Sequence, residues 1–232
     1  MNVASPHTVS NISPHPAGGP SSRWDLVTRI LSQPYLDRTI ALAASIPFVW
    51  LAYYRYQHNK LGLPLISLTI GVLILLATMI VRRPPKRVTP NPLYWLLAFV
   101  ATYWPALTVG LIQKGYALVP DWVTEIVGLL GLVVTVWARL SLGRNIGFVP
   151  AQREIVTTGA YSYMRHPIYT GLFLGYFGLA FRAFSVRNAL ILALGIAWFV
   201  IKSVVEEKFL SADPQYAAYL KRVRARWVPF VA

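Results

Sequence analysis

Six runs of apolar residues separated by polar segments constrain the fold of this chain more than any other feature. A helix needs about 20 mostly apolar residues to cross a bilayer, and 56 % of the chain is hydrophobic, above the roughly 45–50 % of soluble domains. The sequence therefore predicts an all-α integral membrane protein with about six transmembrane segments, the last two of which form a helical hairpin. The runs are Thr39–Tyr56, Leu63–Val81, Leu93–Ile112, Trp122–Leu140, Ile168–Phe181 and Ala189–Val205.

The basic residues are distributed unevenly among the predicted loops. If the six runs alternate in direction, 17 of the 22 Lys and Arg residues lie on one side, with both ends of the chain and the loops after the second and fourth runs. Cytoplasmic loops of membrane proteins carry an excess of Lys and Arg. Both termini and these loops are therefore predicted to be cytosolic, and the net charge of +14 indicates contact with anionic lipids and no nucleic acid partner.

The composition changes along the chain and suggests three parts. Residues 1–22, which are rich in Ser, Pro and Gly, are predicted to form a disordered tail. Residues 23–140 contain the N-terminal membrane helices, and 141–232 contain the remaining helices with most of the polar motifs. The absence of cysteine excludes disulfides, thiolate metal ligands and cysteine nucleophiles, and no metal site is predicted.

The segment Arg165–Gly171, with the sequence RHPIYTG, lies where a predicted cytosolic loop enters the fifth apolar run. Proline is favoured at the first position of a helix, so Pro167 predicts a helix start with His166 near the N-cap. The exposed N–H groups of such a start, beside Arg165, attract a carboxylate or phosphate. A helix cap with an arginine that reaches the membrane surface is the alternative interpretation.

The pair Glu206-Glu207 ends the sixth apolar run, and acidic residues at such a depth tend to be functional. Neighbouring residues on a helix point about 100° apart, so one of the two carboxylates is predicted to face inward. Lys202, one turn earlier, can share the face of Glu206. A surface ion pair is the alternative, whereas a site of carboxylates and aromatic rings would suit a zwitterionic or cationic cofactor such as a sulfonium.

Taken together, these elements resemble the isoprenylcysteine carboxyl methyltransferase family and the related phospholipid N-methyltransferases. The resemblance covers roughly Ser141 to Val228, and before that the chain is similar only in being apolar. It implies a cytosolic cofactor pocket for S-adenosyl-L-methionine. The segments that carry it are Leu142–Asn145, Val156–Tyr161, Arg165–Gly171, Glu206-Glu207 and Tyr216–Tyr219.

The resemblance also implies roles for individual residues. Lys202 and Arg165 would orient the methyl acceptor, and Glu207 is a conceivable base if the acceptor is an amine. The family usually has Arg where this chain has Lys202, and a lysine cannot form the bidentate fork with a carboxylate. The acceptor therefore stays open between a prenylcysteine-like carboxylate and another lipid, with O-methylation favoured over N-methylation. The implied cofactor-binding residues are Arg153, Glu154, Ile155, Val156, Tyr161, His166, Pro167, Ile168, Tyr169 and Glu206.

The favoured function is thus methyl transfer from S-adenosylmethionine to a lipophilic, membrane-resident acceptor. The cofactor would enter from the cytosol and the acceptor sideways between helices. An NADPH-dependent membrane reductase of the steroid-reductase type is one alternative, although no Gly-rich phosphate loop is visible. A non-enzymatic transporter or membrane scaffold is the other. A transporter predicts polar residues in the middle of the spans, and the first four runs contain almost none.

Overall fold

The computed structural model describes residues 26–27, 29–30, 33–58, 63–147, 150–229 and 231, without the side chains of 63–68 and 109. The predicted disordered tail, 1–22, lies outside these residues. The long helices are α2 (Pro34–His58), α3 (Leu63–Val81), α4 (Pro92–Leu111), α5 (Asp121–Leu142), α6 (Pro167–Arg182) and α7 (Val186–Leu210). The shorter elements are β1 (Arg87–Val88), η1 (Gly143–Asn145), β2 (Ala151–Gln152), η2 (Gly159–Ser162) and α8 (Pro214–Arg222).

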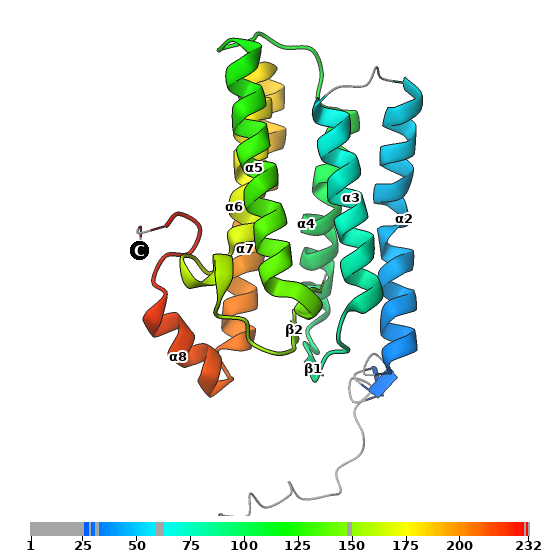
Figure 1. Cartoon of the computed structure of the whole chain (residues 1–232), viewed down its shortest axis with the longest axis vertical. Helices are drawn as coiled ribbons and strands as arrows, with labels where there is room; N and C mark the ends of the chain where they lie inside the picture. Colours follow the sequence, from blue (N-terminus) through cyan, green and yellow to red (C-terminus); the bar gives the residue numbers. More distant parts are fainter. Residues whose placement is uncertain are drawn as a thin grey trace, which may run out of the picture.

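The six long helices coincide with the six predicted apolar runs, so the helical fold class is confirmed. They stand side by side with alternating direction, and α6 and α7 form the predicted hairpin (Figure 1). The ends of α2 and α7 differ most from the prediction. Helix α2 begins at Pro34, before the apolar run, and α7 continues past Val205 to Leu210. Polar side chains occupy both extensions, which is why the apolar runs did not include them.

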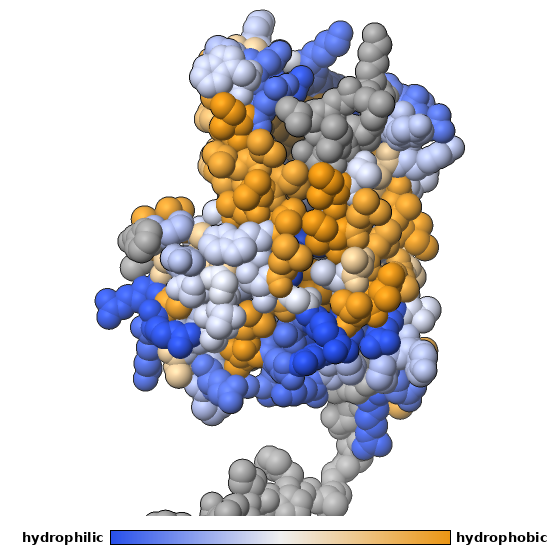
Figure 2. Space-filling model, in the orientation of Figure 1, coloured by the Kyte–Doolittle hydropathy of each residue, from blue (hydrophilic) through white to orange (hydrophobic). Residues whose placement is uncertain are grey.

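Two of the described helical segments are long and apolar enough to cross a membrane. They are Asp121–Asn145 and Val186–Leu210, with mean hydropathies of 1.9 and 2.0 over their most apolar stretches. Hydrophobic residues cover the middle of the face in Figure 2, and hydrophilic residues gather at the end that carries β1, β2 and α8. These observations support a membrane location. A crossing by all six helices, and a cytosolic polar end, stay predictions.

Hydrogen bonds between loops show which loops share an end of the bundle. The loop after α3 contacts the segment after α5, because Arg83 N donates to Arg144 O at 2.7 Å and Arg87 pairs with Gln152 in the antiparallel strands β1 and β2. At the opposite end, Tyr116 and Phe184 exchange two backbone hydrogen bonds of 2.8 Å. The loops that the count of basic residues grouped together therefore lie at one end of the molecule, the polar end.

Helices α5 and α6 pack with their backbones in close contact through glycine. A Cβ atom built on Gly171 would lie 2.1 Å from Thr135 Oγ1 and 2.6 Å from the Gly131 carbonyl oxygen. A Cβ atom on Gly131 would lie 2.7 Å from the Gly171 carbonyl oxygen. Small residues permit this close approach, which favours helix association in an apolar environment. The glycine of the motif Arg165–Gly171 is thus required by its contact with α5.

A buried ion cluster joins the start of α2 to the polar end of α3 and to the segment after β2. Arg82 binds both carboxylate oxygens of Asp37, with Nε 2.6 Å from Oδ2, and Arg153 Nη2 lies 3.8 Å from Asp37 Oδ1. All three residues are between 2 % and 7 % exposed. A single carboxylate therefore compensates two buried guanidinium groups.

Replacement of Gly171 by alanine should destabilise the protein by about 1–3 kcal/mol, because the new methyl group overlaps the backbone of α5. Thermal unfolding in detergent, followed by tryptophan fluorescence, measures the effect. Gly175→Ala is the matched control, since nothing lies within 4 Å of a Cβ atom there, on the same helix. Equal unfolding temperatures for the two variants would contradict the packing described for Gly171.

Asp37→Asn should lower the free energy of unfolding by about 3–5 kcal/mol, because it leaves buried cations without a counter-ion. Asp121→Asn, which removes an exposed carboxylate from the first turn of α5, should change it by about 0.3–1 kcal/mol. Chemical unfolding of both variants in the same detergent provides the comparison. A loss at Asp37 no larger than that at Asp121 would show that the ion cluster does not stabilise the fold.

Candidate functional site

A cavity of about 620 Å³ lies between the helices and reaches the polar end of the bundle. This volume lies within the range of about 300–1,000 Å³ that is usual for small-molecule sites. Its apolar part is lined by α3, α4, α5, α6 and α7, with Val72, Leu75, Pro105, Leu132, Leu179 and Phe199 among the residues. Its polar part is lined by Arg139, Asn145, Arg153, Glu154, Tyr161, Arg165, His166, Lys202 and Glu206.

Most of the residues predicted for the site line this one cavity. They are Arg153, Glu154, Ile155, Val156, Tyr161, Arg165, His166, Ile168, Tyr169, Lys202 and Glu206. Two predicted residues are not among the lining residues. Pro167 is fully buried as the first residue of α6, and Glu207 points toward Arg165, His166 and Arg226.

The motif Arg165–Gly171 starts a helix as predicted, with His166 at the N-cap of α6 and Pro167 at its first position. The structure adds a contact that the sequence did not suggest. The C-terminal segment 224–227 lies along the motif, and the backbone N–H groups of Arg165 and His166 donate to the carbonyl oxygens of Ala225 and Arg226, each at 3.0 Å. The C-terminal segment therefore fixes the backbone from which α6 begins.

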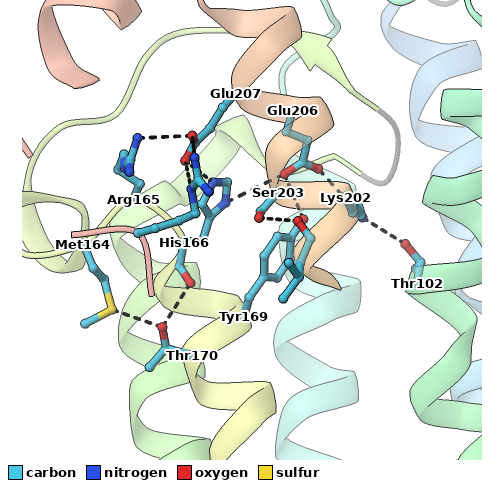
Figure 3. A network of polar contacts seen from close by, with 12 residues as sticks. Thr102, Met164, Arg165, His166, Tyr169, Thr170, Lys202, Ser203, Glu206 and Glu207 are labelled. Carbon is cyan, nitrogen blue, oxygen red and sulfur yellow. Dashed lines mark hydrogen bonds and ion pairs between the residues drawn. The ribbon is translucent and has the colours of Figure 1, made fainter. Parts of the chain in front are cut away.

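Glu207 is the centre of a network of charged side chains behind the motif (Figure 3). Its Oε1 lies 3.0 Å from His166 Nε2, and its Oε2 accepts from Arg165 Nη1 at 3.1 Å and from Arg226 Nη2 at 2.8 Å. Glu207 as a whole is only 6 % exposed. With three basic partners and no place in the cavity lining, Glu207 is arranged to hold the motif together. This geometry does not suit the role of a base that meets an acceptor.

Glu206 points the other way, into the cavity, so one of the two carboxylates faces inward as predicted. Its Oε2 accepts a hydrogen bond of 2.9 Å from the Tyr169 hydroxyl, and its Oε1 lies 3.9 Å from Lys202 Nζ. Lys202 is buried, donates to Thr102 Oγ1 at 3.2 Å and lies 5.8 Å from the centre of the Tyr169 ring. Figure 3 shows these side chains together, with Glu206 between Tyr169 and Lys202. Thr102, on α4, had no signal in the sequence.

The segment Arg153–Val156 follows β2 and forms one wall of the cavity. The guanidinium of Arg153 is already bonded, because its Nε donates to the Arg83 carbonyl oxygen at 2.9 Å and its Nη2 faces Asp37. Burial and, to a smaller extent, the charge of Arg82 lower the pKa of Arg153 to about 10, against the opposing effect of Asp37. A bound molecule would therefore find the guanidinium of Arg153 engaged, and the backbone of this segment is what it could contact.

Tyrosine side chains connect η2 with α8 at the polar end. The Tyr219 hydroxyl donates to the Tyr161 carbonyl oxygen at 2.8 Å, and the rings of Tyr216 and Tyr219 lie 5.6 Å apart. Burial raises the pKa of each of these three phenols above its ordinary value. They therefore stay neutral at physiological pH and contribute hydrogen bonds and ring surface, without charge.

These elements define a class of protein: a helical bundle with a polar pocket at one end and an apolar cavity that continues between the helices. Residues 122–216 match the model of the phospholipid methyltransferase family. The predicted family resemblance is thereby confirmed over this segment. The match begins on α5, earlier than the predicted start at Ser141, and includes the motif Arg165–Gly171 and the Glu206-Glu207 pair.

Two curated proteins are similar to parts of the chain. The nickel-cobalt-cadmium resistance protein NccN of Alcaligenes xylosoxydans xylosoxydans is 38 % identical over 103 residues, which are 43 % of this chain and 47 % of NccN. The cobalt-zinc-cadmium resistance protein CzcN of Cupriavidus metallidurans is 34 % identical over 111 residues, which are 45 % of this chain and 50 % of CzcN. The chain thus spans about half the length of the curated relatives it matches.

The two adjacent glutamates should respond differently to the same substitution. Glu207→Gln should lower the free energy of unfolding by about 3–5 kcal/mol, because buried His166 and the partly buried Arg165 and Arg226 lose their shared counter-ion. Glu206→Gln should lower it by less, because the amide oxygen can still accept from Tyr169 and Lys202, which loses a carboxylate 3.9 Å away, keeps its hydrogen bond to Thr102. Thermal unfolding of both variants and limited trypsin cleavage at 221–226 measure the difference. Equal stability of the two variants would refute the proposed division of roles.

Proposed function

We propose that this protein is an S-adenosylmethionine-dependent methyltransferase of the membrane that acts on a lipophilic acceptor. One observation carries the proposal: the inward-facing carboxylate of Glu206, beside the ring of Tyr169, opens into a cavity that becomes apolar between the helices. The match of 122–216 to the phospholipid methyltransferase family supports the same chemistry.

The residues of the polar part fit the proposed cofactor. Glu206 Oε1 lies 3.9 Å from Lys202, beyond hydrogen-bond distance, and so retains the capacity to accept from an ammonium group. The Tyr169 ring, which stacks on His166, lines the cavity, and aromatic rings attract a sulfonium. The wall Arg153–Val156 completes the pocket. When bound, S-adenosylmethionine supplies a methyl group on a positively charged sulfur. The protein would contribute alignment of the two reactants.

The apolar part of the cavity suits the chain of a lipid acceptor, and Lys202 suits its head group. Lys202 is buried at the junction of the two parts, where its ammonium group can meet a carboxylate or phosphate. A carboxylate oxygen forms its new bond to the methyl carbon while the carbon–sulfur bond breaks and its electron pair goes to sulfur, so no proton has to leave. An amine acceptor would need a base, and Glu207 is engaged elsewhere. O-methylation is therefore favoured over N-methylation.

The proposed topology follows from the distribution of charge. Six crossings with the polar end in the cytosol would let a water-soluble cofactor reach the pocket directly, because the basic loops and the site share that end. The acceptor would enter from the membrane between helices. The boundary proposed near residue 141 would then separate N-terminal membrane helices from the part that holds most cofactor contacts.

The direct test uses purified protein in detergent with methyl-labelled S-adenosylmethionine and a total lipid extract. We expect label in a lipid product, whose chemical identification would distinguish an ester from an N-methylated head group. A parallel binding measurement with NADPH addresses the reductase alternative. Binding of NADPH together with no binding of S-adenosylmethionine would overturn the proposal.

Glu206→Gln should weaken the binding of S-adenosylmethionine by about tenfold to a hundredfold, since hydrogen bonds to charged groups contribute about 1.5–3 kcal/mol. Isothermal titration calorimetry on the folded variant measures this change. Glu125→Gln, at an exposed carboxylate on α5, is the control and should bind as the wild type does. Wild-type affinity in the Glu206 variant would refute the assignment of the pocket.

A further inference from the structure

Arg139 lies in the last turn of α5 and lines the cavity, but its surroundings differ from those of the other basic residues there. Its Nε and Nη1 atoms are buried and have no hydrogen-bond partner among the described residues. Burial of a guanidinium without a partner is unfavourable. A group with this geometry in the wall of a cavity is therefore a candidate to bind a ligand.

The other basic side chains of the cavity wall each face a carboxylate. Arg153 faces Asp37, Arg165 and His166 face Glu207, and Lys202 faces Glu206. The remaining acid of the wall, Glu154, pairs with Arg83. Within the described part of the chain, Arg139 is thus the cation of the cavity wall for which no ion pair is found.

Tyr161 is the titratable neighbour that interacts electrostatically with Arg139. Burial raises the pKa of the Tyr161 phenol, and the carboxylate of Glu206 raises it further. The phenol is therefore neutral at physiological pH and does not compensate the charge of Arg139. The charge is left for a molecule that enters the cavity.

We propose that Arg139 binds an anionic group, a carboxylate or a phosphate, of a molecule held in this cavity. The inference rests on the proposed function, which provides two sources of such a group: the carboxylate of S-adenosylmethionine and the acidic head group of the acceptor. A guanidinium can bind either one with two parallel hydrogen bonds. Arg139 is then a specificity-determining residue beyond those predicted from the sequence motifs.

The test replaces Arg139 with methionine, which has a similar unbranched shape and no charge. Arg224→Met is the control, because Arg224 is an exposed arginine at the same end whose backbone carbonyl accepts from Arg165. Loss of a guanidinium whose buried Nε and Nη1 have no hydrogen-bond partner should leave the unfolding temperature of the Arg139 variant unchanged or raised. A structural role would lower it, and a drop in unfolding temperature that accompanies the loss of binding would overturn the proposal.

The two sources of the anion are distinguished by measuring cofactor binding and the KM for the acceptor separately. If Arg139 binds the cofactor, wild type should prefer S-adenosylmethionine over its decarboxylated form by about tenfold to a hundredfold, and Arg139→Met should bind both equally. If it binds the acceptor, the affinity for S-adenosylmethionine stays unchanged, and KM rises by a similar factor for whichever of N-acetyl-S-farnesylcysteine and phosphatidylethanolamine the wild type methylates.

Other outcomes refute the inference in distinguishable ways. An active wild type with an Arg139→Met variant of equal cofactor affinity and equal KM would overturn the role of Arg139 alone. A wild type that neither binds S-adenosylmethionine nor transfers its methyl group would overturn the proposed function and this inference together.

Discussion

The site depends on the contacts that the Glu207 carboxylate makes with its basic partners. It belongs to α7, and its partners belong to the segment before α6 and to the C-terminal segment 224–227. One buried acid therefore joins three parts of the chain that are distant in sequence. The backbone bonds from Arg165 and His166 to Ala225 and Arg226 reinforce this junction. The start of α6, and with it the position of Tyr169, is thereby fixed against α7.

A second constraint, the glycine contact between α5 and α6, fixes the other side of the same helix. Gly131 and Gly171 bring the two backbones so close that no side chain fits between them. Helix α6 is thus held by charge at its start and by close packing one turn later. Since neighbours on α7 point about 100° apart, Glu207 faces the start of α6 whereas Glu206 faces the cavity beyond it.

The helices, the start of α6 and the inward position of one carboxylate of the Glu206-Glu207 pair were predictable from the sequence, because each follows from a local pattern. Apolar length, a proline at the first position of a helix and the angle between neighbours all act over a few residues. The roles of Asp37, Thr102 and Arg226 were not predictable in this way. Each contacts a partner from a distant part of the chain, as Lys202 does with Thr102 across 100 positions.

The two parts of the cavity also differ in how far the family match covers their walls. The polar part is built largely from 139–216, and this region falls within the segment that matches the phospholipid methyltransferases, apart from contacts such as that of Tyr219. The apolar part has walls from α3 and α4, which precede the match. Similarity to the family therefore informs the proposed cofactor end. The proposed acceptor end also depends on α3 and α4, which the comparison does not cover, so the choice of acceptor would rest on Thr102 and the walls of these two helices as well as on Lys202.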